Sequence, residues 1–445
     1  MAGGLIFFLS GKVIIGFMGK RLKVFAYHVV LWGMLLWVLG PDGGSIASGA
    51  NPATEELLIR FREGTTVTEA EQFLARQGVR PLRRIPHIDV WRVAGTATAV
   101  AAIRANGAGN ELVSWLEPND PVHATSVTPD DPFYLAQQEN LRVIGAPEAW
   151  ALTRGSTRPP LAIIDTGIDL DHPDLGTKIW TNPDEITGNG FDDDNNGYAD
   201  DVWGWDFVND DPVPQDDQSH GSHVAGIAAA ATDNGVGLAG IAWYTPLMPL
   251  KALDSQGLGS VATVAEAIIY AADNGVHILN LSLGSAEFSQ TLADAVAYAQ
   301  AQGCLLIAST GNDGGTVEYP AALPGVLAVS ATDNRDLPWS FSNRGPEVDL
   351  VAPGVDIFSA NRQGSYYITS GTSMATAHVS GVAALLWALE PGLEATALQE
   401  ILLDTAHDVW SPGFDSLTGW GRVDAEAAVR AVHTTAVFLP TTFGR

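Results

Sequence analysis

The sequence is poor in cysteine. Its one cysteine, Cys304, cannot form an internal disulfide, so the fold cannot depend on oxidation within the chain. A catalytic thiol needs an accessible, electropositive setting, whereas Cys304 stands in the apolar run AQGCLLIAST, which is typical of a buried strand. We therefore interpret Cys304 as a small core residue.

Basic residues are also scarce. From residue 132 onward the chain has 11 Lys and Arg against 39 Asp and Glu, and the whole chain has a net charge of −28. Binding to phosphate groups needs clustered Lys and Arg, so nucleic acid is excluded as a partner. The acidic composition favours solubility, bound cations and basic substrates. An acidic surface that only keeps the protein soluble is the alternative.

The N-terminal segment has the order of residues found in secretory signals. The basic stretch KRLK, residues 20–23, precedes a mostly apolar run at 24–39, which the small residues of SIASGA follow. About 16 apolar residues are few for a membrane-spanning helix. We therefore expect residues 1–50 to be a signal peptide, with cleavage after Ala47 or Ala50. An uncleaved N-terminal anchor, which would place the protein at a membrane, is the competing interpretation.

Residues 51–125 have a pattern of their own. Strands are expected at 56–61, 87–93 and 112–118, and helices at 67–78 and 96–107. These elements describe a small α+β module. The stretch PNDPVHATSVTPDDP that follows is rich in Pro and Asp and is typical of an exposed linker.

Between residues 132 and 432, apolar strands alternate with Gly- or Ala-rich helices. This alternation predicts a three-layer α/β fold with a mostly parallel sheet that helices cover on both faces. The ends of such strands carry active sites, and Asp165 and Asn312 fall there. Residues 433–445 are expected to be a C-terminal tail. The predicted strands are 161–167, 247–253, 277–284, 304–310 and 326–332, and the helices 222–232, 262–275, 290–303 and 373–389.

Three polar residues stand where strands end or helices begin. Asp165 ends the strand LAIIDTG, His220 opens the helix of HGSHVAG, and Ser373 begins the helix of GTSMATAHVSG. Nucleophilic acyl transfer needs a hydroxyl, an imidazole that takes its proton, and a carboxylate that orients the imidazole. The order Asp, His, Ser along the chain is one of the known orders of this triad.

The segments DTGIDLDHPDL, HGSHVAG and GTSMATAHVSG resemble the signature segments of the subtilisin family of serine peptidases, and the likeness extends over residues 132–432. The resemblance implies a subtilisin-like fold and endopeptidase activity on polypeptides. It makes Ser373 the nucleophile, His220 the general base and acid, and Asp165 the orienting carboxylate.

Two positions depart from the family pattern. Ser222 replaces the usual Thr of the histidine motif, and Ala377 replaces the usual Pro after the nucleophile. A Pro in the first turn of a helix is favourable but not chemically required. An inactive, calcium-stabilised binding protein on the same fold is the alternative, and the intact triad argues against it.

The same resemblance implies the remaining active-site residues. Asn312 matches the side-chain donor to the oxyanion, and the backbone N–H of Ser373 is the second donor. A substrate would lie as an extended strand against two segments and reach a specificity pocket beyond them. The segments consist of Gly257, Leu258, Gly259, Ser282, Leu283 and Gly284, and Ala308 to Gly311 form the other wall of the pocket.

Glu318, in TVEYPAA, resembles the floor of the specificity pocket. A carboxylate there would favour Lys or Arg on the acyl side of the scissile bond. The alternative is that Glu318 points to solvent from a loop. The linker at 119–131 has no Lys or Arg for self-processing, which also counts against a basic preference.

The run FDDDNNGYADD predicts a calcium site. Its side chains have the D-x-D-x-N-G-x-x-D spacing of EF-hand-like loops, although the twelfth position is Trp203 rather than Glu. A solvated acidic loop is the alternative. The family resemblance implies a second calcium site. The first site comprises Asp192, Asp194, Asn196 and Asp200, and the second comprises Asp174, Asn234 and a carboxylate near Asp131.

The pattern of residues 51–125 resembles the family's propeptide, which assists folding and inhibits the enzyme until it is removed. A separate binding module is the alternative. The sequence as a whole therefore predicts a secreted, monomeric, calcium-stabilised zymogen with its own propeptide as inhibitor. A membrane-anchored processing enzyme remains open if the N-terminal segment is not cleaved.

Overall fold

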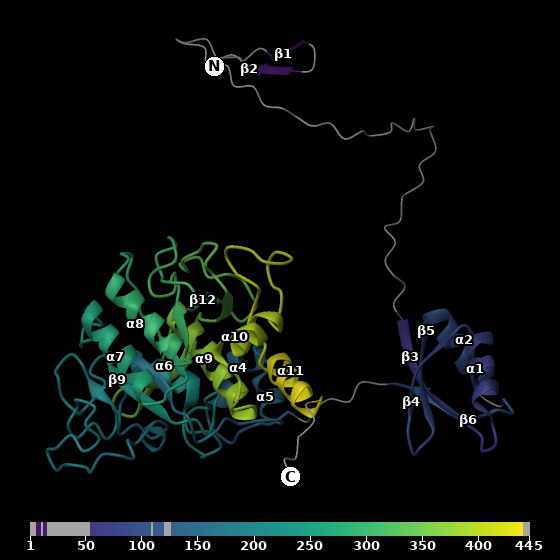
Figure 1. Ribbon diagram of the computed structural model, residues 1–445, viewed down its shortest axis with the longest axis horizontal. Helices are drawn as coiled ribbons and strands as arrows, with labels where there is room; N and C mark the ends of the chain where they lie inside the picture. Colours follow the sequence, from purple (N-terminus) through teal and green to yellow (C-terminus); the bar gives the residue numbers. More distant parts are fainter. Residues whose placement is uncertain (1–5, 10–11, 16–53, 108–109, 120–125, 439–445) are drawn as a thin grey trace. The chain divides into compact units, whose positions relative to one another are not determined.

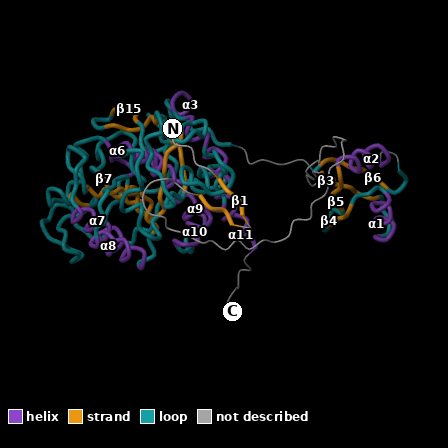
Figure 2. Tube along the Cα trace, turned by 90° about the horizontal axis from the view of Figure 1, so that it is seen from above, coloured by secondary structure: helices purple, strands orange, loops and turns teal. Residues whose placement is uncertain are grey.

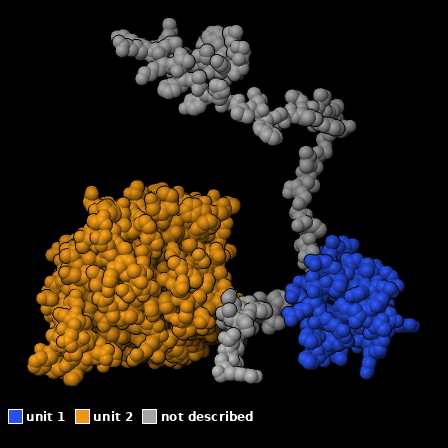
Figure 3. Space-filling view, viewed as in Figure 1, with its two compact units in different colours: residues 1–121 blue, residues 122–445 orange. Residues whose placement is uncertain are grey.

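The computed structural model describes residues 6–9, 12–15, 54–107, 110–119 and 126–438. The chain forms two compact units, residues 1–121 and 122–445 (Figure 3). The segment predicted as a signal peptide lies outside the described residues, except for two short antiparallel strands, β1 (Ile6–Leu9) and β2 (Lys12–Ile15).

The first unit contains a four-stranded antiparallel sheet in the order β4-β5-β3-β6 with two helices. Leu57, Phe73 and Val93 belong to its hydrophobic core. The sequence did not predict β4, because this edge strand is charged and mostly exposed. The bounds are β3 Thr54–Phe61, α1 Val67–Arg76, β4 Arg80–Ile85, β5 Val90–Thr96, α2 Ala97–Gly107 and β6 Val113–Pro118.

The strand expected at 87–93 begins three residues late. His87 and Asp89 have positive φ angles and form the turn before β5. Positive φ is costly for most residues, although Asp and His tolerate it better than β-branched residues do.

The second unit is built on a seven-stranded parallel sheet in the order β13-β12-β11-β10-β7-β9-β8. Every strand predicted between residues 132 and 432 belongs to this sheet. The bounds are β7 Leu161–Asp165, β8 Trp205–Asp206, β9 Leu247–Lys251, β10 Ile278–Leu281, β11 Leu305–Ser309, β12 Leu327–Thr332 and β13 Leu350–Pro353.

Helices cover both faces of this sheet, which confirms the predicted three-layer fold (Figures 1 and 2). Side chains that alternate along β7 pack into different cores. Ile163 packs with α6, α9, α10 and α11, whereas Ile164 packs with α7 and α8. The bounds are α6 His220–Ala229, α7 Val261–Asp273, α8 Gln290–Ala301, α9 Thr372–Leu389, α10 Ala395–Asp404 and α11 Ala425–Phe438.

Helix α9 is long and apolar enough to cross a membrane, but 89% of its residues are buried within the structure. Helix α11 continues to Phe438, so the segment expected to be a tail from residue 433 begins inside a helix. The smaller elements are α3 Tyr134–Gln137, α4 Glu139–Val143, α5 Ala146–Ala149, the 3₁₀ turn Gly176–Lys178, and the hairpin of β14 Ile357–Asn361 and β15 Ser365–Thr369.

The parallel sheet brings its carboxyl ends to one edge. Strand β7 ends at Asp165 and β9 at Lys251, before the loop that leads to residues 257–259, and β10 and β11 end directly before residues 282–284 and 310–312. Because neighbouring parallel strands point the same way, these segments meet at the same edge of the sheet.

Candidate active site

Asp165 and His220 are in direct contact at this edge. The two carboxylate oxygens of Asp165 lie 2.7 and 2.9 Å from Nδ1 of His220. One of them also accepts the backbone N–H of Thr166 at 2.7 Å. Asp165 is fully buried, while the side chain of His220 is 26% exposed. The carboxylate therefore fixes the imidazole through Nδ1 and leaves Nε2 for the cavity.

Gly221 allows helix α6 to begin so close to Asp165. A Cβ atom at this position would lie 2.1 Å from the carbonyl oxygen of Gly167 and 3.2 Å from Cβ of Asp165. Such contacts are far inside van der Waals distance, so any side chain would push the helix away. The glycine of the motif HGS is thus required by close approach rather than by its φ angle.

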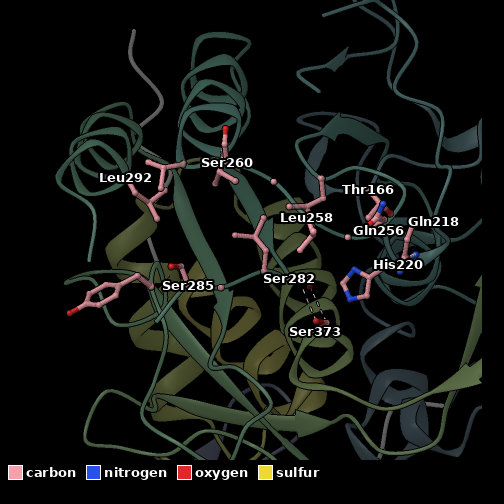
Figure 4. A pocket seen from close by; sticks show the side chains of 18 of the residues that line it. Thr166, Gln218, His220, Gln256, Leu258, Ser260, Ser282, Ser285, Leu292 and Ser373 are labelled. Atoms are coloured by element: carbon pink, nitrogen blue, oxygen red, sulfur yellow. Dashed lines mark hydrogen bonds between the residues drawn. The ribbon is translucent and has the colours of Figure 1, made fainter. Parts of the chain in front are cut away.

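Ser373 is the second residue of α9, and it lines the same cavity of about 550 Å³ as His220. Figure 4 shows the two side chains directed into this cavity, with Ser282 next to Ser373. The hydroxyl of Ser373 donates to the carbonyl oxygen of Ser282 at 3.3 Å. Catalytic hydrogen bonds are often long or misaligned before a substrate binds.

The two departures from the family pattern do not disturb this geometry. Ser222 is buried, and its hydroxyl donates to Asp216 at 2.6 Å and accepts the N–H of Asp169 at 2.9 Å. Ala377 is fully buried in the core. Because α9 begins at Thr372, Ala377 lies in the second turn of the helix and not in the first, as we had assumed from the sequence.

Asn312 is oriented for donation into the cavity. Its amide oxygen accepts both the backbone N–H and the hydroxyl of Thr372, at 2.9 and 3.0 Å. The amide NH₂ group is therefore left for the cavity, which Asn312 lines. The N–H of Ser373 lies in the first turn of α9, where N–H groups have no partner within the helix. Both groups can donate into the cavity that Asn312 and Ser373 line.

The two histidines of HGSHVAG have opposite protonation behaviour. Burial disfavours the charged form of His220, but the carboxylates of Asp165 and Asp216 outweigh it and raise its pKa. Burial lowers the pKa of His223 to about 3, and its Nε2 contacts the carbonyl oxygen of Ile357 at 3.1 Å. His223 is therefore a neutral structural residue, and His220 is the histidine that can exchange protons.

Both predicted substrate-binding segments line the cavity, and Leu258 in the first of them is 64% exposed. Ala308 and Gly311 are not among the residues that line the cavity. Ala308 lies in β11 and packs in the core beside α7 and α8. The lining residues are Gly257, Leu258, Gly259, Ser282, Leu283 and Gly284.

Glu318 lies against Gly284 of the cavity wall and against Gly311, and it is not itself among the residues that line the cavity. A Cβ atom at Gly284 would be 2.3 Å from one of its carboxylate oxygens, and a Cβ atom at Gly311 would be 2.9 Å from its carboxyl carbon. Burial, and then the charge of Asp313, raise the pKa of this half-buried carboxyl group. Among the described residues, no Lys or Arg forms an ion pair with it.

The predicted metal loop holds a different set of carboxylates from the one that its spacing indicates. Asp194 lies with Glu185 and Asp201, and ligand atoms of all three are within 4.8 Å of one another. The amide NH₂ of Asn196 donates to both Asp194 and Asp201. Asp201 is fully buried. Three converging carboxylates fit a hard cation such as Ca²⁺.

Asp192 and Asp200 instead close turns of this loop. Asp192 accepts the backbone N–H groups of Asn196 and Gly197, and Asp200 accepts those of residues 189 and 190. Asp192 and Asp194 both accept the N–H of Asn196, but Asp192 and Asp200 are not in the cluster of three carboxylates that includes Asp194. Glu185 and Asp201 take their place, and no spacing rule identifies them.

The second predicted site brings its residues together. Asn234 donates to Asp174 at 3.3 Å, and both Asp131 and Asp174 are buried. One carboxylate oxygen of Asp131 is buried without a hydrogen-bond partner. Burial raises the pKa of Asp131 to about 6, and the charge of Asp174 adds to this effect. A cation fits here because it would satisfy the unpaired oxygen and offset the repulsion.

Comparisons with known proteins agree with this geometry. A family model described as the subtilase family matches residues 157–421. The chain is 36% identical over 379 residues to a thermophilic serine proteinase of Bacillus sp. strain AK1, covering 84% of this chain and 87% of the relative. It is 39% identical over 306 residues to thermitase of Thermoactinomyces vulgaris, covering 68% and 99%.

A third relative is a halolysin-like extracellular serine protease, Nep, of Natrialba magadii. It is 40% identical over 403 residues, which cover 87% of this chain and 70% of the relative. Among solved structures, a protease from Pseudoalteromonas arctica PAMC 21717 has a TM-score of 0.59 at 27% identity, covering 69% of this chain and all of that chain.

Proposed function

The chain belongs to the subtilase family and is a serine endopeptidase, and we propose that it cleaves polypeptides through an acyl-enzyme formed on Ser373. The observation that supports this assignment most directly is one cavity lined by both His220 and Ser373, with Asp165 bound to the far side of the imidazole. Asp165 orients His220, and His220 acts as the base.

Each residue has a defined step. The hydroxyl of Ser373 turns from Ser282 toward His220, gives its proton to Nε2, and attacks the substrate carbonyl carbon. The amide of Asn312 and the N–H of Ser373 donate to the oxygen that becomes negative. The imidazolium of His220 then protonates the leaving amine, and water releases the acyl group by the reverse proton path.

Replacement of the nucleophile tests this function. We expect Ser373→Ala to lower kcat on a denatured protein by about 10⁶-fold, the magnitude found in subtilisin itself for loss of the triad serine. The matched control is Ser411→Ala, at an exposed serine outside the cavity, which should leave the rate unchanged. Full hydrolysis by a folded Ser373→Ala protein would overturn the assignment.

We further propose that the enzyme is secreted as a zymogen. Residues 1–50 have the composition of a signal peptide, residues 51–125 resemble the family propeptide, and residues 132–432 are the catalytic domain. The word extracellular in the name of the relative from Natrialba magadii supports secretion. An uncleaved N-terminal anchor is the competing possibility.

Calcium is the cofactor that we propose, in a structural role. Glu185, Asp194 and Asp201 would hold one ion, and Asp131 with Asp174 would hold another. Bound calcium neutralises these carboxylates and ties the loops that carry them together. Neither set of residues lines the catalytic cavity, so calcium would affect stability rather than the acyl transfer itself.

We also propose that Glu318 favours substrates with Lys or Arg on the acyl side of the scissile bond. The support is its half-buried carboxylate against Gly284 and Gly311, without a basic partner among the described residues. An incoming guanidinium or ammonium would supply the missing counter-charge.

A further inference from the structure

A second buried carboxylate, Asp216, lies behind the catalytic pair. It is 3% exposed and belongs to the segment before helix α6. One of its oxygens accepts the hydroxyl of Thr166 at 2.9 Å and the N–H groups of Gln218 and Ser219 at 2.9 and 2.8 Å. The other accepts the N–H and the hydroxyl of Ser222 at 3.0 and 2.6 Å. Hydrogen-bond donors thus stabilise the negative charge of the Asp216 carboxylate.

These bonds connect the segments that carry Asp165 and His220. Thr166 directly follows Asp165, whereas Ser219 and Ser222 flank His220 along the chain. The hydroxyl of Thr166, besides donating to Asp216, accepts the N–H of Gly221 at 2.9 Å. The β7 strand end and the start of α6 are therefore joined at several points beyond the contact between Asp165 and His220.

The backbone next to His220 is strained. Ser219 has a φ of 107°, in the region that favours glycine, and it is a residue with a side chain. Strained backbone of this kind persists only where neighbouring contacts over-determine it. The N–H group of Ser219 is held by Asp216. The carboxylate of Asp216 therefore holds the backbone of Ser219, whose conformation determines where the side chain of His220 points.

Two carboxylates among the described residues act on the charge of His220. Asp165 and Asp216 face it with negative charge, and His223, one helical turn away, is neutral. The ammonium of Lys251 lies behind Thr166, where it donates to the Thr166 carbonyl at 3.0 Å and pairs with Asp217 at 2.7 Å. Asp217 therefore neutralises Lys251, and Asp216 has no cationic partner among the described residues.

We infer that Asp216 is a positioning residue for the catalytic histidine, which holds the strained turn before His220 and keeps a second negative charge beside the imidazole. This inference rests on the proposed role of His220 as the base. Asp216 acts through Thr166, Ser219 and Ser222 and does not line the cavity.

The test is Asp216→Asn, which preserves shape but removes the charge and one acceptor site. We expect kcat on a peptide substrate to fall at least tenfold, with KM little changed. Asp216 contributes to the raised pKa of His220, so its neutralisation lowers that pKa. Because His220 must be neutral to act as base, the acid limb of the kcat/KM profile should move to lower pH.

The matched control is Asp415→Asn. The carboxylate of Asp415 also accepts two backbone N–H groups and a hydroxyl, from Leu417 and Thr418, but its loop does not line the cavity. This variant should leave the acid limb where it is in the wild type. An Asp216→Asn enzyme that folds and has the wild-type kcat and acid limb would overturn the inference.

Thr166→Val serves if Asp216→Asn does not fold, because it removes the hydroxyl that bonds to Asp216 and to the N–H of Gly221 and leaves the other bonds of Asp216 in place. We expect it to lower kcat and Thr166→Ser to restore it; wild-type kcat in Thr166→Val would also overturn the inference. Wild type and Ser373→Ala are measured alongside. An inactive wild type refutes the proposed function, whereas an active wild type matched by Asp216→Asn refutes only the role of Asp216.

Discussion

Asn312 can donate to an oxyanion only because Thr372 occupies its amide oxygen with both a backbone N–H and a hydroxyl. The same relation recurs at His220, whose Nδ1 is held by Asp165. In both cases a neighbour that does not react decides which end of a side chain faces the substrate. Orientation of this kind comes from pairs of residues, and single motif positions carry little of it.

Glu318 offers the residue-scale test of specificity. If its carboxylate pairs with the substrate, Glu318→Gln should lower kcat/KM for peptides with Arg at the cleaved position by roughly tenfold to a hundredfold. Peptides with Leu there should be affected little. The measurement is kcat/KM for a pair of peptides that differ only at this residue.

This preference should also depend on pH. The pKa of Glu318 is raised, so the group ionises at a higher pH than an ordinary glutamate. The ratio of rates for Arg and Leu should therefore rise with pH through that pKa in the wild type and stay flat in Glu318→Gln. Glu347→Gln is the matched control, since Glu347 also lies against a glycine, but that glycine, Gly345, does not line the cavity, whereas Gly284 beside Glu318 does. Equal Arg-to-Leu ratios in all three proteins would exclude a role for Glu318.

At the scale of elements, the sequence predicts best what depends on local pattern. Five of the seven strands of the parallel sheet and the helices α6 to α9 are visible as apolar runs of the right length, whereas the short strands β8 and β13 were not predicted. The edge strand β4 was missed because its exposed residues, with Pro81 among them, break the pattern of a strand. Helix α11 was not predicted, because no motif lies in it and its last residues belong to the segment expected to be a C-terminal tail.

In the active site, too, the sequence predicts only the residues that local motifs mark. The motifs carry Asp165, His220 and Ser373, because the chemistry needs those residue types beside glycines. Asp216 and Thr166 are 50 residues apart, and their bond exists only in the folded chain. Asp201 belongs to the carboxylate cluster because it is buried under α7, where Tyr270 donates to it at 2.5 Å. A spacing rule selects its neighbour Asp200 instead.

The loop of residues 180–204 gives a test at this scale. We expect Asp201→Asn to reduce the number of bound calcium ions by one, since Asp201 is in the carboxylate cluster, and Asp200→Asn to leave that number unchanged. Calorimetric titration of the calcium-free protein measures this. Loss of one bound calcium ion in Asp200→Asn but not in Asp201→Asn would instead support the ligand set that the sequence spacing indicates, which includes Asp200.

Removing calcium from the wild type should lower stability. A ligand at a hundredfold excess over its Kd contributes about 2.7 kcal/mol, which corresponds to a drop of roughly 5 °C in Tm on chelation. The drop should be smaller in Asp201→Asn than in Asp200→Asn. A Tm that does not respond to a chelator in any of the three proteins would exclude calcium as the stabilising ion.

For the whole molecule, the separation into two compact units is the feature that bears on activation. The first unit has its own hydrophobic core, including Ile59 and Leu74, so it does not need the second to bury its apolar side chains. A segment that folds around its own core can be separated from the rest by a single cut in the chain between the units. The proposed zymogen needs that property.

Processing of the full chain is therefore the last prediction. Purified wild type with calcium should lose about residues 1–125, as measured by intact mass, whereas Ser373→Ala should keep residues 51–125 because the cut depends on its own nucleophile. Addition of a trace of active wild type to Ser373→Ala distinguishes a cut between molecules from one within a molecule. If the variant is processed alone in purified form, a contaminating protease makes the cut and autocatalytic activation is wrong. If both proteins stay full length while wild type digests a denatured protein, residues 51–125 are a separate module and not an inhibitor.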